Sequence, residues 1–130
     1  MKIGLVINPQ SGVGGSVALK GSDGAELQEL AKQRDGEPRG VERAHAFLER
    51  LLLIIGDLTK ELSWKTWGDE MGETVLQSHQ VDFEVLGHPE SPTVGADTSE
   101  ACSVISSAGV DILIFVGGDG TARDVMDGIS

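Results

Sequence analysis

Two apolar segments, each followed directly by glycines, constrain the fold of this chain most strongly. Residues 2–8 are almost wholly apolar and lead through Pro9 into a glycine-rich stretch. Residues 110–116 are also nearly all apolar and run into Gly-Gly-Asp-Gly-Thr at residues 117–121. Strands that are apolar on both faces are typical of the interior of a parallel sheet. We therefore predict that both segments are central strands, each with a glycine turn at its carboxyl end.

Helical and strand patterns alternate along the rest of the chain. The expected helices cover residues 25–34, 41–55, 69–79 and 97–108, with a last one capped by and beginning at Thr121, and the further strands cover 61–67 and 81–86. This order predicts an α/β fold, a doubly wound, mostly parallel, Rossmann-like sheet with helices on both faces. The two further strands alternate polar and apolar residues, so we expect them further out in the sheet.

The two glycine clusters predict where a ligand binds. If the two apolar strands are neighbours, the strand order reverses between them. Open α/β sheets bind ligands at such a reversal, beyond the carboxyl ends of the strands. Because both glycine clusters follow these ends, we expect one site built from both.

The second cluster suggests phosphate chemistry. Gly117 and Gly118 allow a sharp turn, Gly120 allows backbone N–H groups to approach a phosphate, and the helix that Thr121 begins favours an anion at its N-terminus. Asp119 places a carboxylate beside that anion. It can hold Mg²⁺ between itself and the phosphates, or accept a proton from an attacking hydroxyl. The alternative is an ordinary strand-to-helix turn.

The first cluster fits neither the GxGxxG nor the Walker A pattern. Its glycines can still form a backbone nest for a phosphate, with Asn8 bonding a phosphate or a ribose. Lys20 either adds positive charge to this site or is an ordinary solvated lysine. The residues of this predicted nest are Gly12, Gly14 and Gly15.

Charge and cysteine content exclude several classes of protein. Lys and Arg number 10 against 21 Asp and Glu, a net charge of −11, and no dense basic stretch occurs. We therefore expect neither nucleic acid nor an anionic membrane as a partner. Cys102 is the only cysteine, which rules out an internal disulfide and fits a reducing cytoplasm. A fully apolar run such as residues 51–55 is too short to cross a bilayer, and no longer one occurs in the sequence.

The histidines and tryptophans carry less information. His45, His79 and His88 show no metal-ligand spacing, so we expect no metal role for them. Trp64 and Trp67 should point to opposite faces of one strand, with at least one of them partly exposed.

Two motifs together resemble the NAD kinase and diacylglycerol kinase superfamily. They are Asn8-Pro9-x-Ser11-Gly12 after the first strand and the run at residues 117–121 after the later one. Residues 7–15 and 19–24, with the extension of the second motif to Asp124, are most similar to the bacterial and archaeal ATP–NAD kinase-like branch. The resemblance covers nearly the whole chain and is loosest around residues 88–96.

The resemblance implies a reaction. Members of this branch transfer a phosphoryl group from ATP, or in some cases polyphosphate, to the 2′-hydroxyl of NAD, with Mg²⁺ accompanying ATP. It implies that Asp119 is the catalytic acid/base or organises the metal, and that Arg123 offsets charge on the transferred group. It also implies that four residues lie near the nucleotide phosphates: Asn8, Gly118, Gly120 and Thr121.

The resemblance also implies a domain organisation. Residues 1–130 correspond to the family's N-terminal, nucleotide-binding α/β domain. The family has a further, C-terminal β-rich domain that supplies much of the NAD site and the oligomer contacts, and we expect it to be absent from this chain. The chain alone should therefore turn over poorly, and the full-length protein should be a cytoplasmic homo-oligomer.

Two other functions stay open. A diacylglycerol or sphingosine-type lipid kinase shares both motifs, although the negative charge of this chain disfavours a membrane surface. A non-catalytic nucleotide-binding accessory protein, like relatives associated with acetoin catabolism, would bind nucleotide without transferring phosphate.

Overall fold

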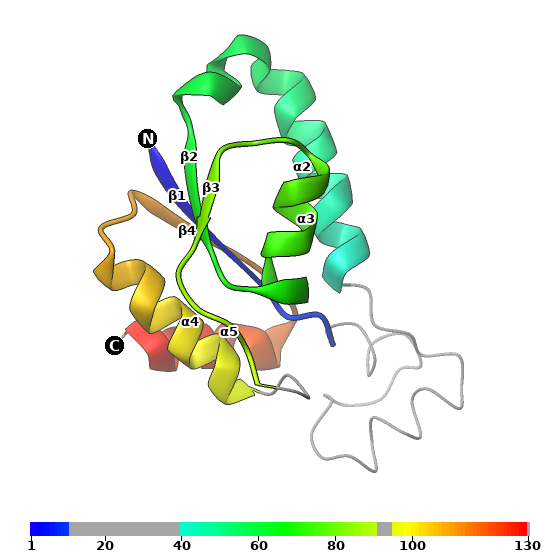
Figure 1. Cartoon of the computed structure of the whole chain (residues 1–130). Coiled ribbons are helices and arrows are strands. Elements are labelled where there is room, and N and C mark those ends of the chain that lie inside the picture. Colours follow the sequence, from blue (N-terminus) through cyan, green and yellow to red (C-terminus); the bar gives the residue numbers. More distant parts are fainter. Residues whose placement is uncertain (11–39, 91–94, 130) are drawn as a thin grey trace, which may run out of the picture.

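A computed structural model of the chain describes residues 1–10, 40–90 and 95–129. The described elements, shown in Figure 1, are β1 (Lys2–Ile7), α2 (Gly40–Ile55), η2 (Gly56–Glu61), β2 (Ser63–Thr66), η3 (Asp69–Met71), α3 (Glu73–Ser78), β3 (Phe83–Val85), α4 (Gly95–Ser107), β4 (Ile112–Val116) and α5 (Asp119–Ile129), where η marks a 3-10 helix. The helix predicted at residues 25–34 lies outside the described residues.

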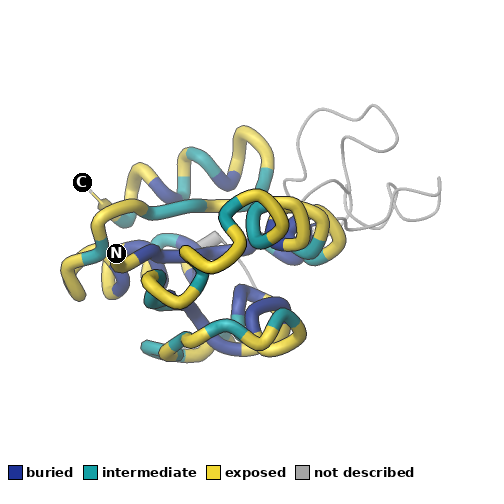
Figure 2. The backbone as a smooth tube through the Cα atoms, turned by 90° about the horizontal axis from the view of Figure 1, so that it is seen from above, coloured by how far each residue is buried: buried dark blue, intermediate teal, exposed yellow. Residues whose placement is uncertain are grey.

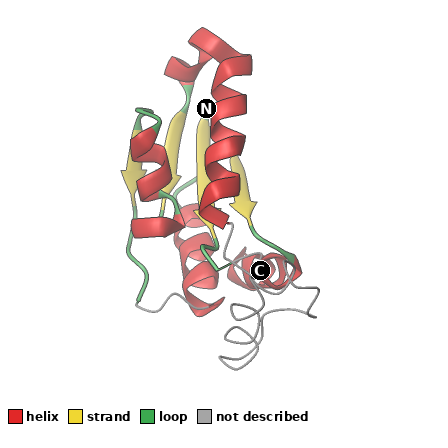
Figure 3. Cartoon of the chain, turned by 90° about the vertical axis from the view of Figure 1, so that its right-hand side faces the viewer, coloured by secondary structure: helices red, strands yellow, loops and turns green. Residues whose placement is uncertain are grey.

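The four strands form one parallel sheet in the order β3-β2-β1-β4. Figure 3 shows them running in the same direction. The chain moves outward from β1 through β2 to β3, and then returns to place β4 on the other side of β1. The strand order therefore reverses between β1 and β4, so the predicted α/β fold and the predicted neighbourhood of the two apolar strands are both confirmed.

The predicted position of β4 within the sheet is wrong. Among the described strands β4 has one neighbour, β1, whereas β2, which we expected further out, lies between β1 and β3. Ile112 and Phe115 of β4 are 46% and 38% exposed. An apolar pattern favours coverage of both faces of a strand, but it does not encode which strands pair, and side chains at the edge of a sheet can stay partly exposed. The pattern therefore could not tell a central strand from an edge strand.

Two apolar clusters cover the two faces of the sheet, and buried residues follow the strands and the inward sides of the helices (Figure 2). Because β1 side chains alternate, Ile3, Leu5 and Ile7 pack with α2 and α3. Val6 packs on the opposite face with residues of α4 and α5. Gly4 also faces that layer, since a Cβ there would lie 2.6 Å from the Ile105 side chain of α4.

The two tryptophans lie in different clusters, as predicted, but neither is exposed. Trp64 belongs to the cluster under α2, and Trp67 belongs to the one under α4 and is only 3% exposed. A Cβ at Gly87 would lie 2.2 Å from the Trp67 ring, so the missing side chain lets the backbone cover that ring. The expected exposure of one tryptophan was therefore wrong.

Gly72 interrupts the helix predicted at residues 69–79. It separates η3 from α3 and has a φ of 152°, which only glycine adopts without strain. A Cβ there would also lie on the Thr66 hydroxyl.

Candidate functional site

The carboxyl ends of β1 and β4 lie side by side, and the two sequence motifs meet there. Ile7 is paired with Val116, and the Asn8 N–H donates to the Val116 carbonyl oxygen at 2.9 Å. Asn8, which follows β1, is therefore bonded to the end of β4, the strand that leads into residues 117–121. The other predicted members of the first cluster lie outside the described residues; they are Gly12, Gly14, Gly15 and Lys20.

The Asn8 carboxamide joins the end of β1 to the first turn of α5. Its Nδ2 donates to the Thr121 hydroxyl at 2.8 Å, and its Oδ1 accepts from the Gln10 N–H at 3.0 Å. The carboxamide therefore holds the turn of one motif against the helix of the other. This positioning role was not visible in the sequence, because the two residues are 113 positions apart.

Thr121 does not begin α5, contrary to the prediction. The helix begins at Asp119, and the Ala122 N–H already donates to the Gly118 carbonyl at 3.0 Å, which makes Gly118 the residue before the first turn. Thr121 is 2% exposed, and its hydroxyl accepts from Asn8. Because the hydroxyl is committed to a tertiary contact inside the first turn, it does not act as the cap.

Gly117 is required by packing. A Cβ at this position would lie 2.2 Å from Thr121 Oγ1 and 2.4 Å from Thr121 Cβ. Its φ is outside the left-handed region, so the turn does not need glycine for its backbone conformation. The close approach of Gly117 to the first turn of α5 accounts for the glycine.

Gly118 and Gly120 have no such explanation within the described part of the fold. Both are exposed, and a Cβ at either position would meet no described atom within 4 Å. Neither has a left-handed φ. The fold therefore leaves these two positions open, and the space beside them is accessible from solvent.

Asp119 and Arg123 extend this open surface. Both are exposed, and they are four residues apart on α5, which places them on the same side of the helix. The first-turn N–H groups of α5 and its dipole favour negative charge at this end. The site can therefore offer backbone donors to an anion, with one carboxylate and one guanidinium beside them.

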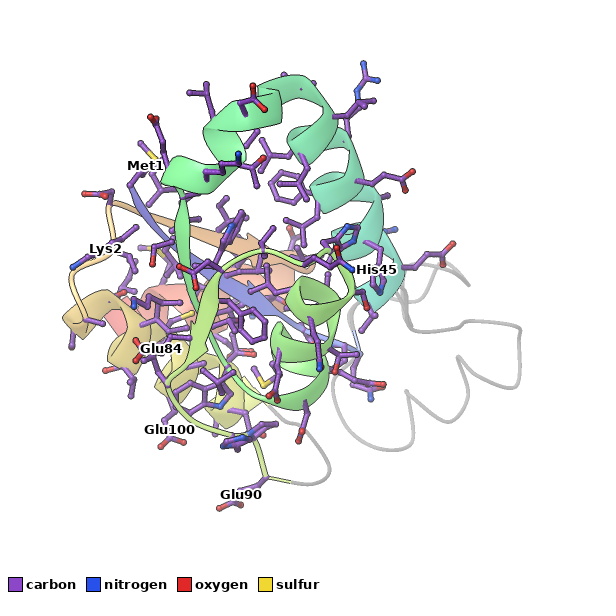
Figure 4. All side chains as sticks on the ribbon, turned by 45° about the horizontal axis from the view of Figure 1, so that its top comes forward. Met1, Lys2, His45, Glu84, Glu90 and Glu100 are labelled. Carbon is purple, nitrogen blue, oxygen red and sulfur yellow. The ribbon has the colours of Figure 1, made fainter. Side chains whose placement is uncertain are left out.

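Two histidines that are distant in the sequence lie next to each other in the structure. His45 of α2 and His79, which follows α3, lie with Nδ1 and Nε2 3.2 Å apart. Figure 4 labels His45 on α2. The sequence carries no signal for this pair, because 34 positions separate its members. Across the described ranges no group of three or more His, Cys, Asp or Glu is placed to hold a metal ion.

Cys102 belongs to α4 and its side chain is buried. Burial, and to a smaller extent the Asp124 carboxylate, raises the pKa of its thiol to about 11. The thiol is therefore protonated near neutral pH and is a poor nucleophile.

No helix within the described ranges is both long and apolar enough to span a membrane.

The fold and the strand-end turn define a doubly wound α/β domain whose open surface lies where the strand order reverses. The family model of the ATP-NAD kinase N-terminal domain matches residues 3–130. The chain therefore belongs to the ATP-NAD kinase N-terminal domain family. Comparison with curated proteins and with solved structures finds no match.

Proposed function

We propose that the chain is the nucleotide-binding part of an NAD kinase-like phosphotransferase. It would help to transfer a phosphoryl group from ATP or polyphosphate to the 2′-hydroxyl of NAD, giving NADP. One observation carries this proposal: in a chain of this family, Asp119 stands exposed between two glycines that the described fold leaves open.

The residues of the site divide into two roles. Asn8, Gly117 and Thr121 hold the first turn of α5 against β1 through a hydrogen bond and a close contact. Gly118 and Gly120 leave the backbone N–H groups of that turn accessible to phosphate oxygens. The predicted nest of Gly12, Gly14 and Gly15, together with Lys20, would complete the phosphate site from the other motif.

Asp119 would act as the general base. The 2′-oxygen of NAD attacks the terminal phosphorus of the donor, and the bond from that phosphorus to the bridging oxygen breaks. The hydroxyl proton passes to the Asp119 carboxylate, and ADP or a shortened polyphosphate leaves. Such transfer depends on positioning and charge stabilisation, to which the α5 N-terminus and Arg123 contribute. A general base typically adds about 10²–10⁴-fold to the rate.

A magnesium ion brought with ATP suits this site in one respect. The Asp119 carboxylate is a hard oxygen ligand, the kind Mg²⁺ prefers, and it is exposed. The described residues hold no group of three ligands, so the phosphates and water would supply most of the coordination. When bound, Mg²⁺ neutralises charge on the phosphates; Asp119 would orient it.

A second, β-rich domain would complete the NAD site, as the family's two-domain organisation suggests, and would provide contacts for a homo-oligomer in the cytoplasm. The chain by itself would then have little activity. The family match favours neither a lipid kinase nor a non-catalytic accessory protein.

The test is NADP formation by the protein that carries this chain together with the β-rich domain. NAD and Mg²⁺ are supplied with ATP or polyphosphate, and Asp119→Asn is compared with Asp127→Asn, an exposed aspartate two turns further along α5. We expect Asp119→Asn to lower the rate by about 10²–10⁴-fold. Asp127→Asn should leave the rate unchanged. Absence of NADP with both donors, or equal rates for the two variants, would refute the proposal.

A further inference from the structure

The His45–His79 pair is a feature that the proposed phosphotransfer does not use. His45 lies in the second turn of α2 and His79 ends α3, the two helices whose buried residues share one apolar cluster. α5 contributes to the cluster on the opposite face of the sheet. The pair is therefore separate from the part of the proposed nucleotide site that α5 provides.

The two rings are oriented toward each other rather than stacked. Nδ1 of His45 and Nε2 of His79 are 3.2 Å apart, the ring centroids are 5.3 Å apart, and the planes are tilted by 44°. Both side chains are half-buried. A neutral imidazole has one donor and one acceptor nitrogen, so in the metal-free pair one proton lies between the two nitrogens.

The same two nitrogens have the separation that a shared metal ion requires. Zn²⁺ binds histidine nitrogen at about 2.0–2.1 Å, and tetrahedral geometry then places two such nitrogens about 3.3 Å apart. The observed 3.2 Å matches this spacing. The separation of the two nitrogens therefore suits a bridging metal ion, which would lie to one side of the line between them and not at the position of the shared proton.

We propose that His45 and His79 form a binding site for a divalent transition-metal ion that links α2 to α3. Imidazole selects ions such as Zn²⁺, Ni²⁺ and Cu²⁺, whereas Mg²⁺ prefers oxygen ligands. Because the described residues hold no third protein ligand near the pair, water completes the coordination. The site therefore binds an exchangeable ion, and the bound ion stabilises the packing of two helices on one face of the sheet.

Calorimetric titration of the whole chain with Zn²⁺ and with Ni²⁺ tests this site. The chain has three histidines, and His88, which is exposed, provides a matched control. We expect one binding event in the unmodified chain and in His88→Gln. In His45→Gln and in His79→Gln the affinity for the metal ion should fall by at least about 10–100-fold. Loss of a residue that only orients a metal ligand already lowers the affinity by that amount.

Thermal unfolding provides a second measurement. Saturating Zn²⁺ should raise the melting temperature of the unmodified chain, since an ion that binds only the folded state stabilises it. The rise should disappear in both variants of the pair, whose folding is checked by circular dichroism. The proposal is overturned if Zn²⁺ leaves the unmodified chain unaffected, if His45→Gln binds as tightly as the unmodified chain, or if His88→Gln loses as much affinity.

Discussion

Gly117, in the turn before α5, and Gly120, in the first turn of that helix, serve different purposes, and substitution can separate them. A Cβ at Gly117 would overlap the Thr121 side chain, whereas a Cβ at Gly120 would meet no described atom. Gly120 lies in the first turn of α5, where alanine is a better helix former by up to about 1 kcal/mol. Gly117 and Gly120 therefore differ in whether the fold itself requires glycine.

We expect Gly120→Ala to leave the fold intact, or to stabilise it slightly, while weakening binding of ATP. Gly117→Ala should instead lower the free energy of unfolding by about 1–3 kcal/mol, as overpacking does. Urea unfolding measures stability, and fluorescence titration with a labelled nucleotide measures binding. If Gly120→Ala binds ATP as well as the unmodified protein, the open surface at the α5 N-terminus is not the phosphate site.

Cys102 predicts a pH dependence of stability. Its folded-state pKa is raised from 9.0 to about 11, chiefly by burial. Folding therefore favours the protonated thiol. The resulting stability is fully present below pH 9 and is lost as the pH rises toward 11.

Between pH 8 and pH 10.5 the unfolding free energy of the unmodified chain should consequently fall further than that of Cys102→Ala, by on the order of 2 kcal/mol. Urea unfolding of both proteins at the two pH values measures the difference, and the variant accounts for every other group that titrates in this range. Parallel declines in the two proteins would show that the thiol keeps its ordinary pKa.

The helix that presents Asp119 is held in place by α4. The Ser99 hydroxyl of α4 donates to the Asp124 carbonyl of α5 at 2.9 Å, and a Cβ at Gly128 would lie 2.3 Å from the Ser99 carbonyl oxygen. The two helices can approach this closely because residue 128 has no side chain. The position of the N-terminus of α5 therefore depends on a contact near its C-terminus.

We expect Gly128→Ala to force α5 away from α4 and to lower the unfolding free energy by about 1–3 kcal/mol. The clash is with backbone, so no side chain can move to relieve it. Gly120→Ala makes the same chemical change on the same helix without a clash, and it serves as the control. Equal stability of the two variants would mean that the α4–α5 packing is looser than the structure shows.

At the scale of the whole molecule, net charge should affect the rate at which nucleotides associate with the chain. The chain carries a net charge of −11, and ATP is an anion. Salt screens the mutual repulsion, with a Debye length of about 30 Å at 0.01 M and about 8 Å at 0.15 M. Hydrogen-bond donors within the site act only after ATP has reached it, so salt affects their contribution less.

We therefore expect the association rate of ATP to increase when ionic strength is raised from 0.01 to 0.15 M. Stopped-flow mixing with a fluorescent ATP analogue at constant free Mg²⁺ measures this rate. A nucleic-acid-binding surface would behave in the opposite way, because salt weakens attraction to phosphates. A decrease in rate would reveal a positive local field around the site that outweighs the net charge.

The sequence by itself determined the strand and helix pattern of the described residues, the α/β class, and the meeting of the Asn8 and Asp119 motifs. These follow from local properties: side-chain periodicity, the conformational freedom of glycine, and the geometry of parallel strands.

Only the tertiary structure decided which contacts each residue makes. It placed β4 at an edge of the described sheet, covered Trp67 with Gly87, and committed Thr121 to Asn8. It also brought His45 to His79. Each of these outcomes joins positions that are distant in sequence or depends on which strand pairs with which. Local periodicity carries no information about such pairings, because they are set by how whole elements pack against one another.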